Sequence, residues 1–195
     1  MNFGMNSILL SLHTGAVAVF TVYYKLQSFF FMPIFGLNNA LIPIVGYNFG
    51  AKKKHRMKEA HRLALIYGFA IIFIGFLLFE LVPGQLIRIF DTGDATLYTL
   101  GVPALRKIGL HYLFAWYCIL TGGVFQAVGN GLYSLITSLS RQLLVLLPAA
   151  YILGRIGGVS AVWWSFPIAE VASMALTVLF YLSINRKILE KLPDD

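Results

Sequence analysis

The sequence contains few charged residues for its length. Only 12% of its 195 residues are Asp, Glu, Lys or Arg, whereas 58% are hydrophobic. Soluble domains carry about 25% charged residues. A chain with so little charge cannot cover a globular surface with groups that water solvates, so the composition excludes a soluble, core-rich domain and favours a membrane protein.

Cysteine and catalytic motifs are also scarce. The single cysteine, Cys118, excludes an internal disulfide framework and a multi-cysteine metal site. No G-x-S-x-G, H-E-x-x-H or phosphate-cradling glycine loop is present, and no apolar run contains two carboxylates three or four positions apart. The sequence therefore predicts no enzyme, no catalytic residue and no metal site. No cleavable signal peptide is expected, because the N-terminus lacks a basic region and a cleavage site.

Long apolar runs, in contrast, fill most of the chain. About 20 apolar residues cross the roughly 30 Å hydrocarbon core of a bilayer. Five runs predict full transmembrane helices, and an apolar segment at residues 1–13 is interpreted as the last turns of a partial one. The five runs are residues 16–49, 63–82, 108–129, 132–153 and 159–184. The expected fold class is an all-α membrane protein, with one transmembrane domain over residues 1–195.

Basic residues cluster at one set of span ends. Residues 51–62, predicted to be a loop, contain Lys52, Lys53, Lys54, Arg56, Lys58 and Arg62. Arg141 and the tail residues Arg186, Lys187 and Lys191 are assigned to the same side, and the opposite loops carry only four basic residues. The positive-inside rule places the basic loop and the C-terminus in the cytoplasm. Because no aromatic residues separate the charges of the loop, nucleic-acid binding is not expected.

Polar side chains inside the predicted spans mark candidate sites, because such groups are costly in hydrocarbon. In the first full span, one helical face carries Thr21, Lys25, Ser28, Met32, Gly36 and Asn39. We interpret this face as the wall of a watery pathway, with Tyr24, Lys25 and Gln27 as candidate substrate-cavity residues. The alternative for Lys25 is that its side chain extends along the helix to the outer interface.

Two later spans add further candidates. Tyr112, Trp116 and Gln126 suit a pocket for apolar or cationic organic molecules, since aromatic rings attract cations. Ordinary helix packing is the alternative for them, and His111 is interpreted as structural. In the last span, Glu170 shares a face with Ser173, Thr177 and Tyr181. It is the candidate for ion coupling, or else a structural acid bonded to a neighbouring helix.

Two stretches of sequence resemble a known family. Gly36-Leu-x-x-Ala40, followed by Pro43-x-x-Gly46-Tyr47-Asn48-x-Gly50-Ala-Lys-Lys53, resembles the inner end of the eighth helix in the multidrug and toxic compound extrusion (MATE) family. Phe125-Gln-Ala-x-Gly129-x-Gly131, Ser138-Leu-x-Arg141-Gln142 and Pro148 resemble the tenth and eleventh helices of bacterial and archaeal members. The motif residues that carry the resemblance are Gly46, Tyr47, Asn48, Gly50, Arg141 and Pro148.

The resemblance implies a secondary active antiporter of twelve helices in two lobes. Such proteins export cationic or amphipathic compounds by alternating access, driven by a proton or sodium gradient and without another cofactor. The chain resembles the second lobe, helices seven to twelve, with the seventh helix truncated. We therefore expect a plasma-membrane protein whose partners are the lipid bilayer, lipophilic or cationic small molecules and another lobe, and which does not transport alone.

One feature of the family does not carry over. A subgroup places cation-binding acids in the seventh and tenth helices, but residues 108–129 contain no Asp or Glu. Two other functions stay open at this point: a lipid-linked oligosaccharide exporter of a related superfamily, and a non-transporting membrane interaction protein. The sequence leaves the substrate, the coupling ion and the oligomeric state undetermined.

Overall fold

The computed structural model describes residues 1–90 and 95–192, so Asp91, Asp94, Asp194 and Asp195 lie outside it. Within these ranges every regular element is a helix, which confirms the predicted fold class. The elements are α1 (Asn2–Leu12), α2 (Thr14–Gly50), α3 (Lys54–Leu81), α4 (Pro83–Arg88), α5 (Ala95–Gly109), α6 (Tyr112–Ala127), α7 (Gly131–Leu139), the π-helix η1 (Ser140–Leu146), α8 (Leu147–Val162), α9 (Ser165–Lys187) and the 3₁₀-helix η2 (Leu189–Lys191).

Four stretches of the described chain are long and apolar enough to cross a membrane. They are α2, α3, the continuous run α7–η1–α8 and α9. α5 and α6 form a fifth candidate, because together they are apolar enough and meet at a bend of 49°. The partial segment at residues 1–13 is the short helix α1, and α4 follows α3 directly after a break at Val82.

The basic segment, predicted to be a loop over residues 51–62, is mostly helix. α3 begins at Lys54, and only residues 51–53 connect it to α2. The reason is that Lys, Arg, Glu, Met and Ala all favour helix. One face of this segment, with Met57 and His61, is also buried. The lysine cluster therefore marks the turn and first turns of a helix rather than a flexible connection.

Two other predicted span boundaries are wrong. The fourth span does not stop at residue 153, because the helix of α8 continues as far as the non-helical Gly158 (φ 63°, ψ −159°), a conformation that glycine adopts without a steric penalty. A short helical stretch after this glycine ends at Val162. The third span, predicted as one helix over residues 108–129, is broken at Leu110 and His111. The His111 Nδ1 donates to the Ile108 carbonyl oxygen at 2.6 Å, and this local hydrogen bond uses a carbonyl at the C-terminal end of α5.

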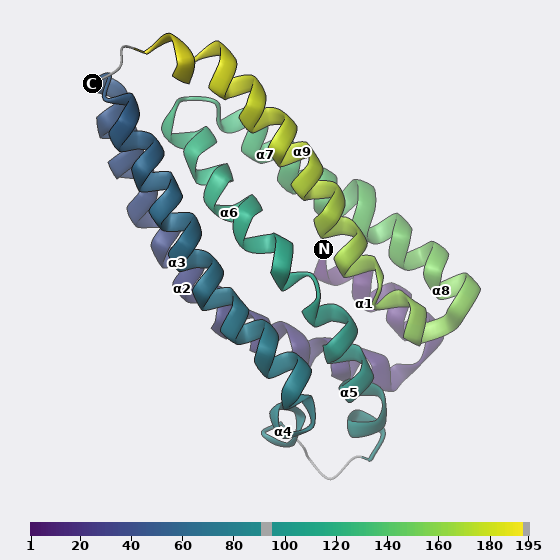
Figure 1. Cartoon of the computed structure of the whole chain (residues 1–195). Coiled ribbons are helices and arrows are strands. Elements are labelled where there is room, and N and C mark those ends of the chain that lie inside the picture. Colours follow the sequence, from purple (N-terminus) through teal and green to yellow (C-terminus); the bar gives the residue numbers. More distant parts are fainter. Residues whose placement is uncertain (91–94, 193–195) are drawn as a thin grey trace.

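The helices form a bundle built on the long pair α2 and α3 (Figure 1). α6 packs against both members of this pair and against α9, and α1 packs on α8 and α2. Besides the larger hydrophobic core, a smaller buried cluster joins Leu41, Val45, Met57, Ile184 and Leu189. The basic turn between α2 and α3 and the C-terminal end of α9 therefore lie at the same end of the bundle.

Candidate functional site

A cavity of about 600 Å³ lies among α1, α2, η1 and α9. Its aromatic lining comes from Phe3, Tyr24, Phe31, Phe35 and Phe166. Its polar lining comes from Asn2, Gln27, Ser28, His111, Arg141, Gln142 and Glu170. Apolar walls with a few placed polar groups are the usual composition of a small-molecule site. Two of the predicted cavity residues, Tyr24 and Gln27, thus line one space with the predicted coupling residue.

An ion pair forms part of the cavity wall. Arg141 on η1 donates from Nη1 to both carboxylate oxygens of Glu170 on α9, at 3.0 and 3.4 Å. The Arg141 side chain is 25% exposed and that of Glu170 only 5%. Glu170 is therefore bonded to a neighbouring helix, as one of the two interpretations of its sequence position required. A role in ion coupling stays a prediction.

The sequence assigned Arg141 to the basic side of the membrane. The structure corrects this assignment, because Arg141 lies inside a helical stretch. It lies ten residues into the helical stretch 131–162, about 15 Å from the start of that stretch. The π-helix that holds it, η1, ends just before Pro148. Because proline has no N–H, the α-helical bond to the Leu144 carbonyl cannot form, and a wider turn is one way to accommodate this loss.

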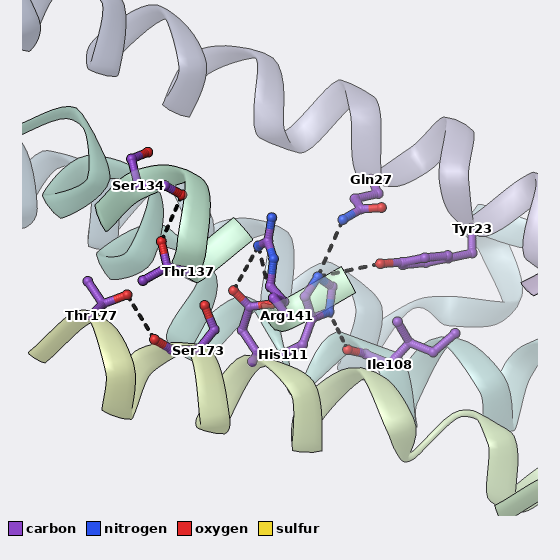
Figure 2. A network of polar contacts seen from close by, with 10 residues as sticks. Tyr23, Gln27, Ile108, His111, Ser134, Thr137, Arg141, Ser173 and Thr177 are labelled. Atoms are coloured by element: carbon purple, nitrogen blue, oxygen red, sulfur yellow. Dashed lines mark hydrogen bonds and ion pairs between the residues drawn. The ribbon is translucent and has the colours of Figure 1, made fainter. Parts of the chain in front are cut away.

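His111 connects the cavity wall to α2 through a polar network (Figure 2). Since its Nδ1 faces the Ile108 carbonyl, Nδ1 carries the proton and Nε2 is the acceptor. The Tyr23 hydroxyl and the Gln27 amide approach Nε2 at 3.4 and 3.5 Å. The ring stacks on Phe31, with centroids 5.9 Å apart. The interpretation of His111 as only structural missed its position in the wall, because the break after α5 turns it inward.

A second, smaller cavity of about 140 Å³ lies beside the first. Gln126, a predicted cavity residue, lines it and donates to the Ser134 hydroxyl at 3.0 Å. Phe35, Ile119 and Arg141 line both cavities, so the two are adjacent. Asn38 also lines the smaller one, and within the described chain its buried Oδ1 has no hydrogen-bond partner. The smaller cavity is therefore the more polar of the two.

Three predicted cavity residues lie elsewhere. The Lys25 ammonium lies 5.8 Å from the centre of the Phe90 ring, next to α4, which agrees with the alternative of an interfacial lysine. Trp116 donates from Nε1 to the Leu113 carbonyl at 3.1 Å and packs on Phe69. Tyr112 is fully buried in the core. The sequence placed all three near polar faces, but tertiary packing assigns them to helix contacts.

The family-motif residues of α2 do not line the cavity beside Arg141. Gly46, Tyr47, Asn48 and Gly50 form the last turns of α2. A Cβ at Gly46 would lie 3.6 Å from the Ala127 carbonyl oxygen, so the helices approach closely there. Asn48 donates to the Ile44 carbonyl at 2.8 Å within its own helix. These residues shape the end of a helix rather than the wall of the cavity beside Arg141.

We expect Tyr112→Phe to stabilise the protein slightly or leave it unchanged. Within the described chain the buried Tyr112 hydroxyl has no hydrogen-bond partner, so its removal eliminates a desolvation cost of about 1–3 kcal/mol. Tyr23→Phe is the matched control, because that hydroxyl faces His111 Nε2 and its loss should destabilise. Thermal unfolding in detergent measures both, and a Tyr112→Phe variant that is less stable than Tyr23→Phe contradicts the assignment.

Comparison with known proteins identifies the family. The MatE family profile matches residues 1–152 of the chain. The chain belongs to the MATE family. The profile match agrees with the resemblance of the two motif regions in the sequence. The matched residues include Arg141 and Pro148, the motif residues of the fourth span.

Curated relatives of this MATE chain include multidrug export proteins called MepA. The one from Staphylococcus haemolyticus is 26% identical over 185 residues, which cover 94% of this chain and 40% of the relative. The one from Staphylococcus aureus strain MRSA252 is 27% identical over 196 residues, covering 94% of this chain and 41% of the relative. The chain thus spans about two-fifths of the length of the curated relatives it matches.

Solved transporter structures share the fold. An outward-facing multidrug resistance MATE transporter superposes with a TM-score of 0.88 at 23% identity, over 99% of this chain and 43% of the other. An inward-facing structure gives a TM-score of 0.85, also at 23% identity, over 97% of this chain and 44% of the other. At this identity the likeness establishes the arrangement of helices alone.

Proposed function

We propose that this chain is one lobe of a multidrug efflux antiporter and that its cavity forms one wall of the substrate site. The observation that carries the proposal is the cavity of about 600 Å³ with aromatic walls and a small polar set. Rings such as Tyr24 and Phe35 accept flat lipophilic molecules and cations on their faces. The MepA relatives, which are named multidrug export proteins, support the same class of substrate.

The proposal includes a second lobe. The matched transporters are more than twice as long as this chain, and the cavity is open on one side of the bundle. The chain superposes about equally on an outward-facing and an inward-facing structure, which supports a lobe that moves as a rigid body during alternating access. On this view, binding of a proton or sodium ion shifts the equilibrium between the two states.

We further propose that the Arg141–Glu170 pair couples ion binding to substrate release. A proton or sodium ion that binds Glu170 competes with Arg141 for the same carboxylate oxygens. Because the bound ion neutralises the carboxylate, the positive charge of Arg141 would then be uncompensated in the cavity wall. The proposed orientation places the basic segment and the C-terminus in the cytoplasm of a plasma-membrane protein, and the shared end of α3 and α9 supports it.

Dye binding tests the substrate site. We expect the Tyr24→Ala/Phe35→Ala variant to bind a lipophilic cationic dye, rhodamine 6G, about tenfold more weakly, since each ring contributes on the order of 0.5–1.5 kcal/mol. Both side chains are exposed into the cavity, at 42% and 52%, so their removal leaves the core intact. Phe29→Ala/Tyr47→Ala removes two exposed rings of the same helix outside the cavity and is the matched control.

Fluorescence polarisation of the purified protein measures both affinities. Equal weakening by the two variants would mean that the dye partitions onto exposed rings and would contradict the cavity as its site. In proteoliposomes, the chain by itself is expected to move no dye when a pH or sodium gradient is applied. Dye efflux under these conditions would refute the need for a second lobe.

A further inference from the structure

A second large hollow lies outside the proposed substrate site. It is a groove of about 600 Å³ between the C-terminal half of α2 and the N-terminal half of α3, and it shares no lining residue with the cavity at Arg141. Its walls are mainly apolar, with Leu37, Ala40, Leu41, Ile44, Leu63 and Tyr67. Ile44, Leu63 and Tyr67 are 48%, 44% and 58% exposed. The groove is therefore an open, apolar surface feature.

The length of the groove matches one leaflet of a bilayer. It extends from Leu37 to Asn48 on α2 and from Arg56 to Tyr67 on α3. At the helical rise, each of these segments is about 16 Å long. Half of a hydrocarbon core is about 15 Å. The length of the groove therefore suits a single extended acyl chain. The polar lining residues Asn48, Arg56 and Glu59 lie at one end of it.

That polar end lies next to the basic turn. Residues 52–62 contain six basic residues and one acidic residue, Glu59. Lys52 and Arg56 are exposed, and α3 begins at Lys54, so its positive dipole end points the same way. Basic pockets at the cytoplasmic ends of membrane helices suit anionic lipid head groups. The charge at the mouth of the groove thus complements a phosphate.

The backbone of the turn limits how a phosphate could be held there. Lys52 has a φ of +58°, in the left-handed region where glycine is the usual residue after a helix. A lysine there costs about 1 kcal/mol. The Lys52 and Lys53 amides donate to the Phe49 and Asn48 carbonyls, so these two groups are already used and a phosphate must be held by side chains. These two bonds are the pair that defines a Schellman cap, so the left-handed conformation of Lys52 belongs to the end of α2.

From the length of the groove, its apolar walls and the basic residues at its polar end, we propose that it binds an anionic phospholipid. One acyl chain lies between α2 and α3, and the phosphate contacts Arg56 and the lysines of the turn. The lipid holds the turn at the membrane surface and fixes the depth of the α2–α3 pair. This inference stands independently of the substrate and of the coupling mechanism.

Native mass spectrometry tests the proposed lipid site. The protein is released from nanodiscs that contain equal amounts of phosphatidylglycerol and phosphatidylcholine, and the lipids that it retains are measured. The wild type is expected to retain phosphatidylglycerol preferentially. Lys53→Gln/Arg56→Gln should lower its retention at least fivefold. Arg186→Gln/Lys187→Gln removes two exposed charges at the same end of the bundle and should retain it. Inorganic phosphate alone should not displace the lipid.

A groove-filling pair tests the acyl chain. Ala40→Phe places a ring in the groove at an exposed position and should also lower retention, whereas Ala175→Phe, at an exposed position on α9, should not.

Lys53→Arg/Arg56→Lys preserves the charge and should behave as wild type, which separates loss of binding from loss of fold. Equal retention of both lipids by the wild type, or unchanged retention in Lys53→Gln/Arg56→Gln or Ala40→Phe, overturns the proposal. A lipid-free dimer that Ala40→Phe dissociates would instead make the groove an interface between copies.

Discussion

Arg141→Met is expected to destabilise the protein by about 3–5 kcal/mol, because it leaves Glu170 as an unpaired charge in a buried position. The effect should depend on the remaining carboxylate rather than on the lost arginine. The double variant Arg141→Met/Glu170→Leu removes both charges and should therefore recover most of the stability, since apolar replacements of buried ion pairs are often neutral or stabilising. The free energy of unfolding in detergent micelles measures the complete double-mutant cycle.

Arg155→Met provides the control. Arg155 lies in the same helical stretch, is exposed, and bonds the Tyr151 hydroxyl at 2.7 Å rather than a carboxylate. Its replacement should change the free energy of unfolding by no more than about 0.5 kcal/mol. A double variant as unstable as Arg141→Met would show that the two residues do not act as a pair.

The same double variant separates coupling from structure. If the pair only supports the fold, Arg141→Met/Glu170→Leu binds dye with the same dependence on proton and sodium concentration as the wild type. If Glu170 is the coupling site, the variant folds and binds dye, but the ion dependence of its affinity disappears. The second outcome is the one that the proposed mechanism requires.

The helices were predictable where one physical signal dominated. α2 and α9 were found within three residues at their C-terminal ends, because long apolar runs there end in polar or basic residues. The break at His111 and the continuation of α8 as far as Gly158 were not predictable from hydropathy. They depend on a side-chain contact to one carbonyl and on a single glycine with a positive φ, at which the regular helix is interrupted. Neither changes the apolar content of the run.

The site was predictable only in part for a related reason. Glu170, Tyr24 and Gln27 were recognised as polar or aromatic groups at membrane depth. Arg141 was assigned to the turn side of the fourth span because basic residues usually mark span ends. A signal against that assignment was present, since Arg141 and Glu170 are opposite charges in neighbouring apolar runs and each lowers the cost of the other. Which helix faces pair, however, is decided by tertiary contacts between segments 29 residues apart.

Phe79→Ala is expected to have the largest effect of a core substitution, about 2 kcal/mol or more. Phe79 is fully buried and its ring lies 5.0 Å from that of Tyr112, 5.8 Å from Phe30 and 6.4 Å from Tyr23. In water-soluble proteins such a truncation costs about 3–5 kcal/mol. In lipid the transfer part of this cost is small, because the acyl chains are as apolar as the core, and the loss of packing around the cavity remains.

The consequence should reach the candidate site, because Phe79 supports the bend that positions His111. A Cβ at Gly109, near the end of α5, would lie 3.0 Å from the Phe79 Cβ, and Tyr23 contacts both Phe79 and His111. Phe79→Ala should therefore also weaken dye binding, whereas Phe79→Leu should restore part of both properties. Phe73→Ala, on the same helix but 36% exposed, should cost less than about 1 kcal/mol and leave dye binding unchanged. If the two alanine variants unfold at the same temperature, the aromatic cluster does not hold α3 against the α5–α6 bend.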